Sequence, residues 1–330
     1  MALNKDTLLN AVLSATGGKV YVKYNVNGDP LYMVRIPRFN LEDIDPALGS
    51  GPHPAFIVNG VVKNEIFIGA YQAIYEKGCA ISIPGQSPKV SATWDNMKAA
   101  CVANGAGFHM MTNWEWAAVA LWCLKNGFQP RGNTTSGKSD SAGYETGTPA
   151  PDNAAKTLAG SGPVSWRHDN TIGGIADLVG NVYEWIDGFK IVDGKVYMPA
   201  DNDFNLAEAS WPNPTGTQLI FPASAGTESG WRTMTTAFGS LSADVKKQLA
   251  AAMVVPNITS GNTPLGIFNL DGNACHGGFW IDANPSTGER MPFRGGGWDA
   301  GAGAGLGALG LSSVRSSVNS AVGCRPAFIL

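Results

Sequence analysis

The sequence predicts a mixed α+β protein with two helices, short antiparallel strands and much irregular coil. Its 42 glycines and 20 prolines are spread along all 330 residues, and this distribution requires many turns. Short stretches of alternating apolar and polar residues indicate strands, whereas only a few segments carry apolar residues at helical spacing. Hydrophobic residues make up 44% of the chain and charged residues 15%, a composition that supports a sizeable core.

The N-terminal quarter predicts one short helix and two strand pairs. Residues 5–15 have apolar residues at helical spacing, and the two glycines that follow would end a helix. Residues 19–37 alternate like a hairpin with its turn at Asn27-Gly28. Residues 55–75 predict a second pair of strands.

Two central segments predict helices. Residues 93–103 form the first, with a cap at Ser91 or Thr93. Residues 113–125 form the second, which is apolar on most faces and therefore belongs in the core.

The remainder of the chain predicts strands separated by long coil. Residues 129–162 are rich in Gly, Ser, Thr and Pro and predict an irregular region. Residues 173–185 predict a strand, and residues 189–198 a hairpin. Further strands are predicted at 265–270 and 279–282.

Composition excludes several classes of function. The net charge is −3 and the pI is near 5.8, without a Lys/Arg cluster, so we expect no nucleic-acid surface. The N-terminal residues show no signal peptide, and no stretch is apolar enough to cross a membrane. The cysteines are odd in number and never in a CxxC pair, so we expect free, mostly buried thiols and folding in a reducing cytoplasm.

The residues that usually carry catalysis do not form a known pattern. The four histidines share no metal-binding spacing, and we expect each to be structural or in a loop. Cys275 and His276 are adjacent, so their side chains would point apart in a strand. No nucleophile elbow, phosphate-binding loop or complete calcium loop is present. The residues alone therefore assemble no active site.

Three stretches lie in a fixed order: "MTNWEWAAVALWC" (111–123), "GGIADLVGNVYEWIDG" (173–188) and "FRGGGW…GCRPAF" (293–328). Together they resemble the C-type-lectin-like fold in its formylglycine-generating-enzyme (sulfatase-modifying factor) branch. The second stretch is the most specific of the three. The strands from about residue 30 fit the opening hairpin of that fold.

The C-terminal segment more closely resembles one subgroup, the variable proteins of diversity-generating retroelements. Their closing pattern alternates a fixed framework with variable positions. The framework positions here are Arg294, Gly295, Gly296, Trp298, Gly301, Ala304, Gly305, Leu309, Leu311, Arg315, Ser316, Val322, Gly323, Arg325, Pro326 and Ala327. "WCLKNGFQPRGNTTSGK" (122–138) is also similar to this subgroup rather than to the enzymes.

The resemblance implies that the interspersed positions contact ligand. They are Gly297, Asp299, Ala300, Ala302, Gly303, Gly310, Ser312, Ser313, Ser317, Ser320 and Ala321, with Val318 and Cys324 less certain members. In such systems template adenines are copied with errors, so that Asn codons become almost any NNC codon. NNC codons cannot encode Trp, Met, Lys, Gln or Glu, and none of these occurs from Asp299 to Cys324.

The resemblance also sets the expected domain organisation. A short N-terminal helix and lead-in segment occupy 1–28, and the lectin-like domain occupies 29–330. Residues 200–265 look like an insertion that contains a short helix at 242–252. The C-terminal variable region covers 293–327.

A variable surface must tolerate substitution, so its side chains are expected to face solvent on a firmly held backbone. We expect Arg294, Arg315 and Arg325 to hold the coil by donating to carbonyls. Leu309 and Leu311 would face the core, and we expect Trp298 to be a core anchor.

One cofactor follows from the resemblance. The enzyme branch holds a structural calcium around its G-N-V-W-E-W segment. The matching positions are Asp177, Gly180, Val182 and Glu184, whose oxygens suit a hard cation. The alternative is that Asp177 and Glu184 cap turns or pair with an arginine. No other cofactor is expected to be required.

The alternative function is a metal-dependent oxidase or modifying enzyme of the same fold. Formylglycine-generating enzymes use a copper-binding cysteine pair after the R-G-G-S-W motif, whereas here Cys324 stands alone. Related iron-dependent sulfoxide synthases need a histidine cluster, which is absent. We therefore expect no enzymatic activity.

The expected function is binding of a protein or glycan ligand on a host or target surface, without nucleic acid or membrane insertion. The lack of an export signal favours a phage tail or virion, with a cytoplasmic location and an intracellular ligand-sensing module as alternatives. Strong interfaces favour Tyr, Trp and Arg, so this copy, with its Gly, Ala and Ser, is expected to bind weakly or through backbone and shape. The oligomeric state stays open.

Overall fold

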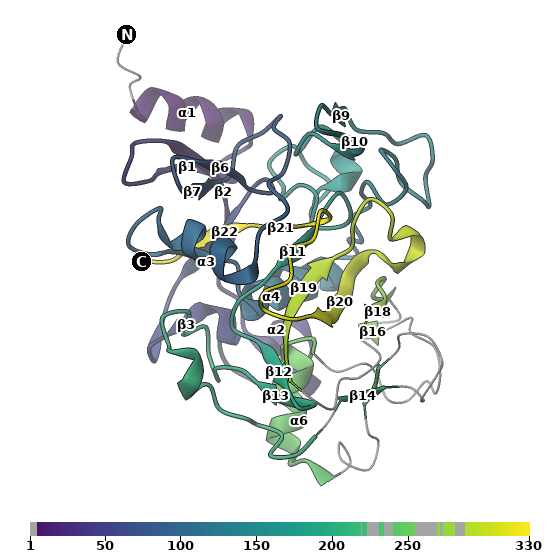
Figure 1. Ribbon diagram of the computed structural model, residues 1–330. Coiled ribbons are helices and arrows are strands. Elements are labelled where there is room, and N and C mark those ends of the chain that lie inside the picture. Colours follow the sequence, from purple (N-terminus) through teal and green to yellow (C-terminus); the bar gives the residue numbers. More distant parts are fainter. Residues whose placement is uncertain are drawn as a thin grey trace.

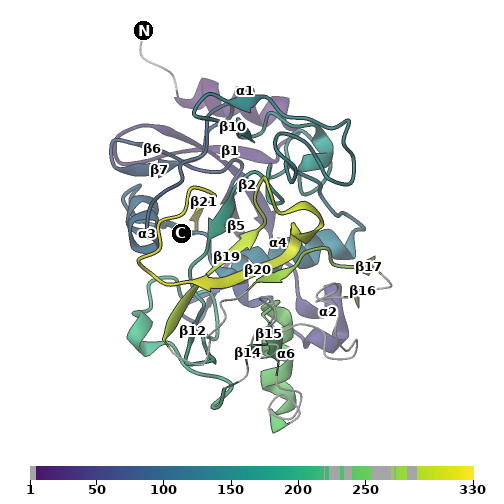
Figure 2. The ribbon, with the colours of Figure 1, turned by 45° about the vertical axis from the view of Figure 1, so that its right-hand side comes forward.

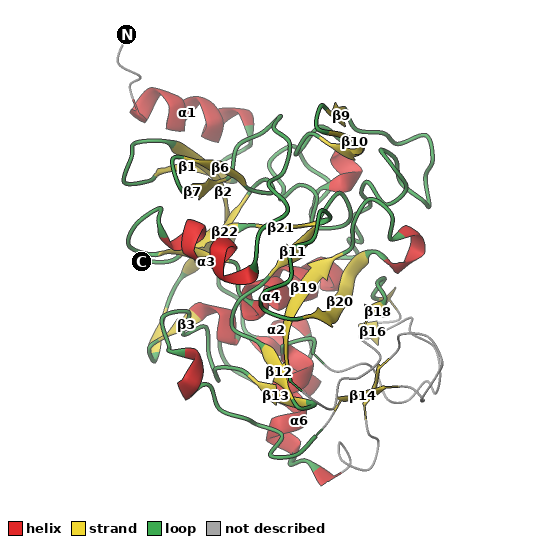
Figure 3. Cartoon of the chain, viewed as in Figure 1, coloured by secondary structure: helices red, strands yellow, loops and turns green. Residues whose placement is uncertain are grey.

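The computed structural model describes residues 5–218, 240–254, 273–280 and 288–330, and the short strand segments 220–222, 231–233 and 269–270 (Figure 1). The described part is mixed α+β, with few helices and small, mostly antiparallel sheets (Figure 3). Its α-helices are α1 (Lys5–Ala15), α2 (Leu41–Ile44), α3 (Trp94–Val102), α4 (Asn113–Lys125) and α6 (Ala243–Ala251). The expectation of two helices was therefore too low, even within these residues. Single 3₁₀ turns are η1 (Pro46–Leu48), η2 (Pro54–Phe56), η3 (Val164–Trp166), η4 (Glu208–Ser210) and η5 (Gly301–Gly303).

The first sheet joins both ends of the chain. Its order is β1 (Val20–Tyr24), β2 (Pro30–Pro37), β5 (Glu65–Gly69), β22 (Pro326–Phe328) and β8 (Phe108–Met110), and every neighbouring pair is antiparallel. The N-terminal hairpin is confirmed, with Gly28 at φ 81° in its turn. Because β1 is a strand of this sheet, residues 20–24 are part of the same packing unit as the residues that follow.

The second sheet carries the C-terminal segment. It has the order β13 (Lys195–Tyr197), β12 (Lys190–Val192), β19 (Glu289–Gly295), β11 (Tyr183–Trp185) and β21 (Val322–Cys324), while β20 (Gly305–Ser313) pairs with β19 and β18 (Phe279–Trp280). The 189–198 hairpin is confirmed. The strand predicted over 173–185 shrinks to Tyr183–Trp185, because Asp177, Gly180 and Asn181 all have left-handed φ angles that turn the chain.

The remaining strands form two-stranded ribbons. They are β3 (Ile57–Val58) with β4 (Val61–Val62), β6 (Ile74–Glu76) with β7 (Cys79–Ile81), β9 (Pro149–Ala150) with β10 (Asn153–Thr157), β14 (Ile220–Pro222) with β15 (Trp231–Thr233), and β16 (Asn269–Leu270) with β17 (Asn273–Ala274). Residues 55–75 therefore hold a hairpin and two further strands rather than one pair. Residues 265–268 and 281–282 of the predicted strands lie outside the described residues.

Helix α4 is the central support of the second sheet. Thr112 caps it in a capping box with Glu115, and most of its side chains are buried on all sides. In both views α4 lies behind β19 and β20 (Figures 1 and 2). The indole of Trp116 donates to the carbonyl of Leu306 in β20 at 2.9 Å, so helix and sheet are also joined by a hydrogen bond. The predicted α3 is confirmed as well, with Thr93 as its cap.

The segment after residue 240 packs into the same core. Leu249 of α6 is buried, and so are Ala252 and Met253 after the helix. The side-chain amide of Asn113 donates to the carbonyl of Ala252 at 2.9 Å. This part of the predicted insertion is therefore fixed against the start of α4. None of the described helices is both long enough and apolar enough to span a bilayer.

Candidate ligand-binding surface

Two connections flank β20 at the surface, and we name them by their residues. The arch is residues 297–303, between β19 and β20. The loop is residues 312–321, from the end of β20 to the start of β21. β19 and β20 run side by side as the yellow-green and yellow ribbons in Figure 2. Arch and loop therefore emerge at opposite ends of one nine-residue strand.

Burial differs between the framework and variable positions that the resemblance implies. Twelve of the sixteen framework residues are buried, whereas nine of the eleven variable positions are exposed or half-buried. Those nine are Asp299, Ala300, Ala302, Gly303, Ser312, Ser313, Ser317, Ser320 and Ala321. Gly297 and Gly310 are buried, so the expectation of solvent-facing side chains fails at these two positions. Of the less certain pair, Val318 is exposed and Cys324 is buried in β21.

The framework glycines are fixed by backbone geometry. Gly295 has φ 90°, and a Cβ placed there would lie 2.4 Å from the carbonyl oxygen of Leu178. At Gly323 a Cβ would lie 2.7 Å from the carbonyl oxygen of Lys89. A backbone oxygen cannot move aside as a side chain can, so no other residue fits these two sites.

The arch is held by backbone hydrogen bonds to a neighbouring coil. Gly301 N donates to the carbonyl of Thr134 at 2.9 Å, and Ser136 N donates to the carbonyl of Trp298 at 2.7 Å. Trp298 N donates in turn to the carbonyl of Asn181 at 3.0 Å. The Trp298 residue is half-buried rather than enclosed in the core, so main-chain contacts do the anchoring that we expected of its side chain.

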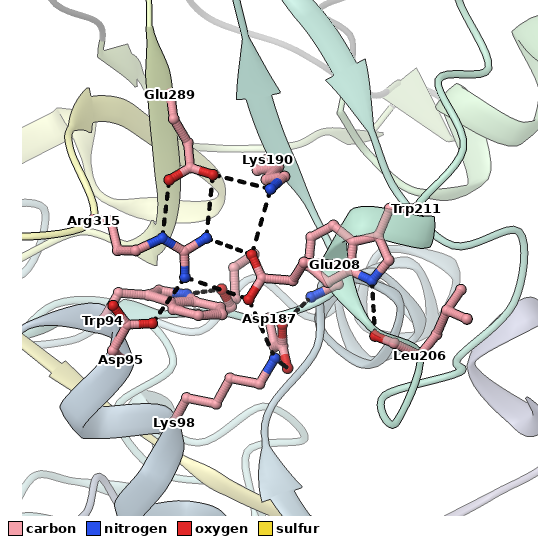
Figure 4. A network of polar contacts seen from close by, with 12 residues as sticks. Trp94, Asp95, Lys98, Asp187, Lys190, Leu206, Glu208, Trp211, Glu289 and Arg315 are labelled. Atoms are coloured by element: carbon pink, nitrogen blue, oxygen red, sulfur yellow. Dashed lines mark hydrogen bonds and ion pairs between the residues drawn. The ribbon is translucent and has the colours of Figure 1, made fainter.

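The loop is held by Arg315, whose guanidinium is surrounded by carboxylates (Figure 4). It donates to Glu289 Oε2 at 2.9 Å, to Asp95 Oδ1 at 2.8 Å, and to both oxygens of Glu208. It also stacks over Trp94, with 4.7 Å to the ring centroid. The expected carbonyl partners are thus replaced by acidic side chains. The hydrogen bonds from Arg315 lower the pKa of Glu289.

Two lysines extend this charge network (Figure 4). Lys190 lies 2.9 Å from Glu289, and Lys98 lies 2.8 Å from the buried Asp187. Beside the network is an open hollow of about 390 Å³, lined by the start of α3, by β19 and by residues 314–316. The loop therefore borders a charged hollow that its own Arg315 helps to build.

Arg325 joins the two sheets from inside. It stands between β21 and β22 and has no exposed surface. Its guanidinium makes a two-bond ion pair with Glu184, at 2.9 and 2.6 Å. It also donates to the carbonyls of Gly69 at 2.7 Å and Ala176 at 2.9 Å. The carbonyl contacts agree with expectation, and Glu184 adds a buried counter-charge.

Arg294 is buried without a carboxylate beside it among the described contacts. It donates to Asn113 Oδ1 at 2.7 Å and to the carbonyl of Met253 at 2.8 Å. Burial lowers its pKa to about 9. This residue ties β19 to the start of α4 and to the end of α6.

The four residues matched to a calcium site do converge, but on a side-chain amide. Gln72 Nε2, which carries two hydrogens, lies within hydrogen-bonding distance of four oxygens: the carbonyls of Asp177 at 3.0 Å, Gly180 at 3.4 Å and Val182 at 2.9 Å, and Glu184 Oε1 at 3.1 Å. An N–H donor and a cation compete for the same oxygens, and Arg325 already neutralises Glu184. A cation would therefore bind these oxygens only if the Gln72 amide moved away.

The carboxylate of Asp177 accepts a hydrogen bond from a neighbouring turn. Its Oδ2 accepts from Gly160 N at 2.7 Å, and its Oδ1 has no hydrogen-bond partner among the described residues. Burial raises the pKa of Asp177 to about 6. Asp177 thus caps a turn, which is the alternative that the sequence left open.

Most of the other candidate catalytic groups are buried. Burial lowers the pKa values of His53 and His168 to about 4, so both are neutral ring acceptors in the fold. Cys275 is buried and His276 is exposed, so the two point apart as expected. All five cysteines are free and buried, which confirms that prediction. Within the described residues, no three His, Cys, Asp or Glu side chains gather closely enough to hold a metal ion.

The described chain is thus a mixed α+β protein in which the arch and the loop lie at the surface, and the segments that flank them are held by buried arginines and backbone hydrogen bonds. No family model matches it, and no curated protein matches it. Solved structures similar to it include the major tropism determinant U1, I1 and P3c variants, at 13%, 13% and 12% identity and TM-scores of 0.34, 0.34 and 0.35. The matches cover 91%, 91% and 94% of this chain, but only 64%, 56% and 63% of those chains. This chain therefore spans less than two thirds of the length of those proteins.

Several residues of the surface could not be found from the sequence. Gln72 lies 105 residues before the nearest oxygen it binds, in a segment without any motif. The acidic partners of Arg315 come from α3, η4 and β19, which are distant along the chain. Thr134 and Ser136 belong to the coil predicted at 129–162, and their backbone contacts leave no signature in side-chain type.

Proposed function

We propose that this chain is a non-enzymatic ligand- or receptor-binding protein whose C-terminal segment is diversified by a retroelement. In this proposal the fold is C-type-lectin-like, of the formylglycine-generating-enzyme type, and the arch and loop display the variable surface. The observation that carries the proposal is the burial of twelve framework residues, whereas nine of the eleven variable positions are exposed or half-buried. Exposed substitutions change stability little, so such a segment can vary without unfolding the protein.

The proposed ligand is a protein or glycan on a host surface, and the proposed location is a phage tail or virion. The exposed positions of this copy are mainly Gly, Ala and Ser, which leave backbone groups open to a partner and supply few anchor side chains. Strong interfaces depend on buried Tyr, Trp and Arg. This copy is therefore proposed to bind weakly, while other copies of the same scaffold bind tightly.

A pair of libraries tests the proposal. One library varies the nine exposed positions of the arch and loop through NNC codons. The control library varies nine buried framework positions of the same segment in the same way. Protease resistance of displayed clones measures folding, and we expect most clones of the first library and few of the second to stay folded.

The folded clones of the first library are then selected on intact host cells and on isolated surface proteins and glycans. Enriched clones should carry Tyr, Phe or Arg, all of which NNC codons encode, at some of the nine positions. Equal folding losses in the two libraries would contradict the proposed division. At the locus, the proposal requires a reverse transcriptase gene and a near-copy of the coding segment for 297–324 that differs at adenines.

A further inference from the structure

Gly297 and Gly310, the two buried variable glycines, differ from Gly295 and Gly323 in what would block a side chain. A Cβ at Gly297 would lie 2.9 Å from Cε2 of Tyr183, and a Cβ at Gly310 would lie 1.9 Å from Cε2 of Phe293. Neither glycine has a left-handed φ, so the backbone itself accepts a side chain at both positions. The obstacle in each case is an aromatic ring on a rotatable bond.

The two rings touch each other beneath the surface. Phe293 is paired directly with Gly310 across β19 and β20, so its ring covers the space left by the missing side chain. Tyr183 is half-buried on β11, and its ring meets Phe293 edge-on, with centroids 5.1 Å apart and planes at 78°. Phe293 is buried and also meets the buried Trp185 edge-on, at 5.6 Å and 85°, so displacing its ring costs packing energy, whereas the half-buried Tyr183 is less constrained.

The rings also connect the arch to the loop. Tyr183 contacts Gly297 of the arch, and its backbone N donates to the carbonyl of Ala321 in the loop at 2.9 Å. Ser312 lies two residues beyond Gly310 on β20, where the register of β20 against β19 shifts, and it is exposed. The two rings therefore lie between the arch, which Tyr183 contacts at Gly297, and Gly310 on β20, which is two residues before the exposed Ser312.

We propose that Tyr183 and Phe293 are specificity-determining residues of the variable surface, whose ring positions are set by the residues at 297 and 310. A side chain at either position pushes its ring aside, and the surface between arch and loop changes shape. Substitution at two buried positions thus changes the ligand-contacting surface through two aromatic residues that are not themselves varied. The binding role rests on the proposed function, whereas the ring displacement needs no ligand.

A double-mutant cycle tests the displacement. Gly310→Val is made in the natural chain and in the Phe293→Ala background, with Gly323→Val as the matched control blocked by backbone. The midpoint of thermal unfolding is measured for each variant. We expect Gly310→Val to lower the midpoint of the natural chain by several degrees, and to leave it unchanged or raise it when Phe293 is absent. Gly323→Val should prevent folding in both backgrounds.

The tyrosine is tested by Gly297→Ser. This variant should stay folded and change the near-ultraviolet circular dichroism of tyrosine, and the change should vanish in a Tyr183→Leu background. Gly310→Val being equally damaging with and without Phe293, or Gly297→Ser leaving the tyrosine signal unaltered, would overturn the inference.

Binding is compared afterwards, so that the two proposals can fail separately. In a clone selected from the nine-position library, Gly297→Ser should change affinity for the selecting protein or glycan at least fivefold, and only when Tyr183 is present. Ring coupling without any selectable binder would contradict the proposed function alone. A selected binder whose affinity ignores both rings would contradict this inference alone.

Discussion

The same C-terminal segment places one arginine inside the molecule and another at its surface. Arg325 has no exposed surface and joins two sheets through Glu184 and two backbone carbonyls. Arg315 keeps 28% of its side chain exposed and collects three carboxylates from separate elements. The first contact defines the fold, whereas the second only orders the loop. Of the two arginines, the first therefore belongs to the fixed core, and the second orders one surface connection.

The largest effect is expected for Arg325→Ala. The variant leaves Glu184 buried without its counter-charge, and breaking a buried pair in this way costs about 3–5 kcal/mol. Urea unfolding followed by circular dichroism measures the loss. Arg315→Ala is the matched control, since it removes the same side chain from the same segment. Similar losses for the two variants would break the comparison.

Gln72→Glu should cause the next largest loss of stability. The variant keeps the acceptor that binds Asn181 Nδ2 at 2.9 Å, but it replaces the donating amide with a further oxygen among four acceptors. Unsatisfied buried groups of this kind cost about 1–3 kcal/mol. The thermal midpoint should fall accordingly.

Calcium sharpens the same test. Because the amide already fills the oxygen cage, neither millimolar calcium nor a chelator should move the thermal midpoint of the natural chain. In Gln72→Glu the cage is left with oxygens only, so calcium should restore part of the lost stability. A calcium-dependent midpoint in the natural chain would show that a cation displaces the amide.

Asp177→Asn tests how a buried carboxyl group near Arg325 makes the stability of the protein depend on pH. The pKa of Asp177 is raised from 3.8 to about 6 in the fold, so the folded state favours the neutral acid. Its contribution to stability is complete below pH 3.8 and is lost as pH rises through about 6. Asparagine is neutral at every pH, so the free energy of unfolding of the variant should rise relative to that of the natural chain as pH rises from 3.8 to about 6. At pH 7 the difference should be about 1–3 kcal/mol. Parallel pH profiles of the two proteins would contradict the assignment.

The fold was predictable where local chemistry specifies it. Thr112 and Glu115 form a capping box that can be recognised in the letters, and Asn27-Gly28 specifies a tight turn. The strand predicted over 173–185 was overestimated, because apolar letters there pack in turns whose carbonyls bind Gln72. Periodicity cannot show a turn that is stabilised by a side chain a hundred residues away.

The candidate surface was predictable as a pattern of letters but not as contacts. The framework positions could be listed from the sequence, yet the partners of Arg315 come from three distant elements. Gly297 and Gly310 were expected to face solvent, because glycine has no side chain whose polarity would indicate whether the position is buried. Only the structure shows Tyr183 and Phe293 in the space above them.

The smallest effect is expected for Arg315→Ala, and its value lies in where it acts. Partly exposed ion pairs contribute about 1 kcal/mol or less and are screened by salt, so the loss of stability should shrink at high ionic strength. The loop has few other ties to the framework: Ser91 N donates to the carbonyl of Asn319 at 3.0 Å, and Tyr183 N to that of Ala321. Amide hydrogen exchange should therefore speed up in residues 312–318 and stay unchanged in the arch, which is bonded to Thr134 and Ser136 instead. Faster exchange in both connections would mean that arch and loop are one cooperative unit, and that the charge network orders the whole variable surface rather than one end of it.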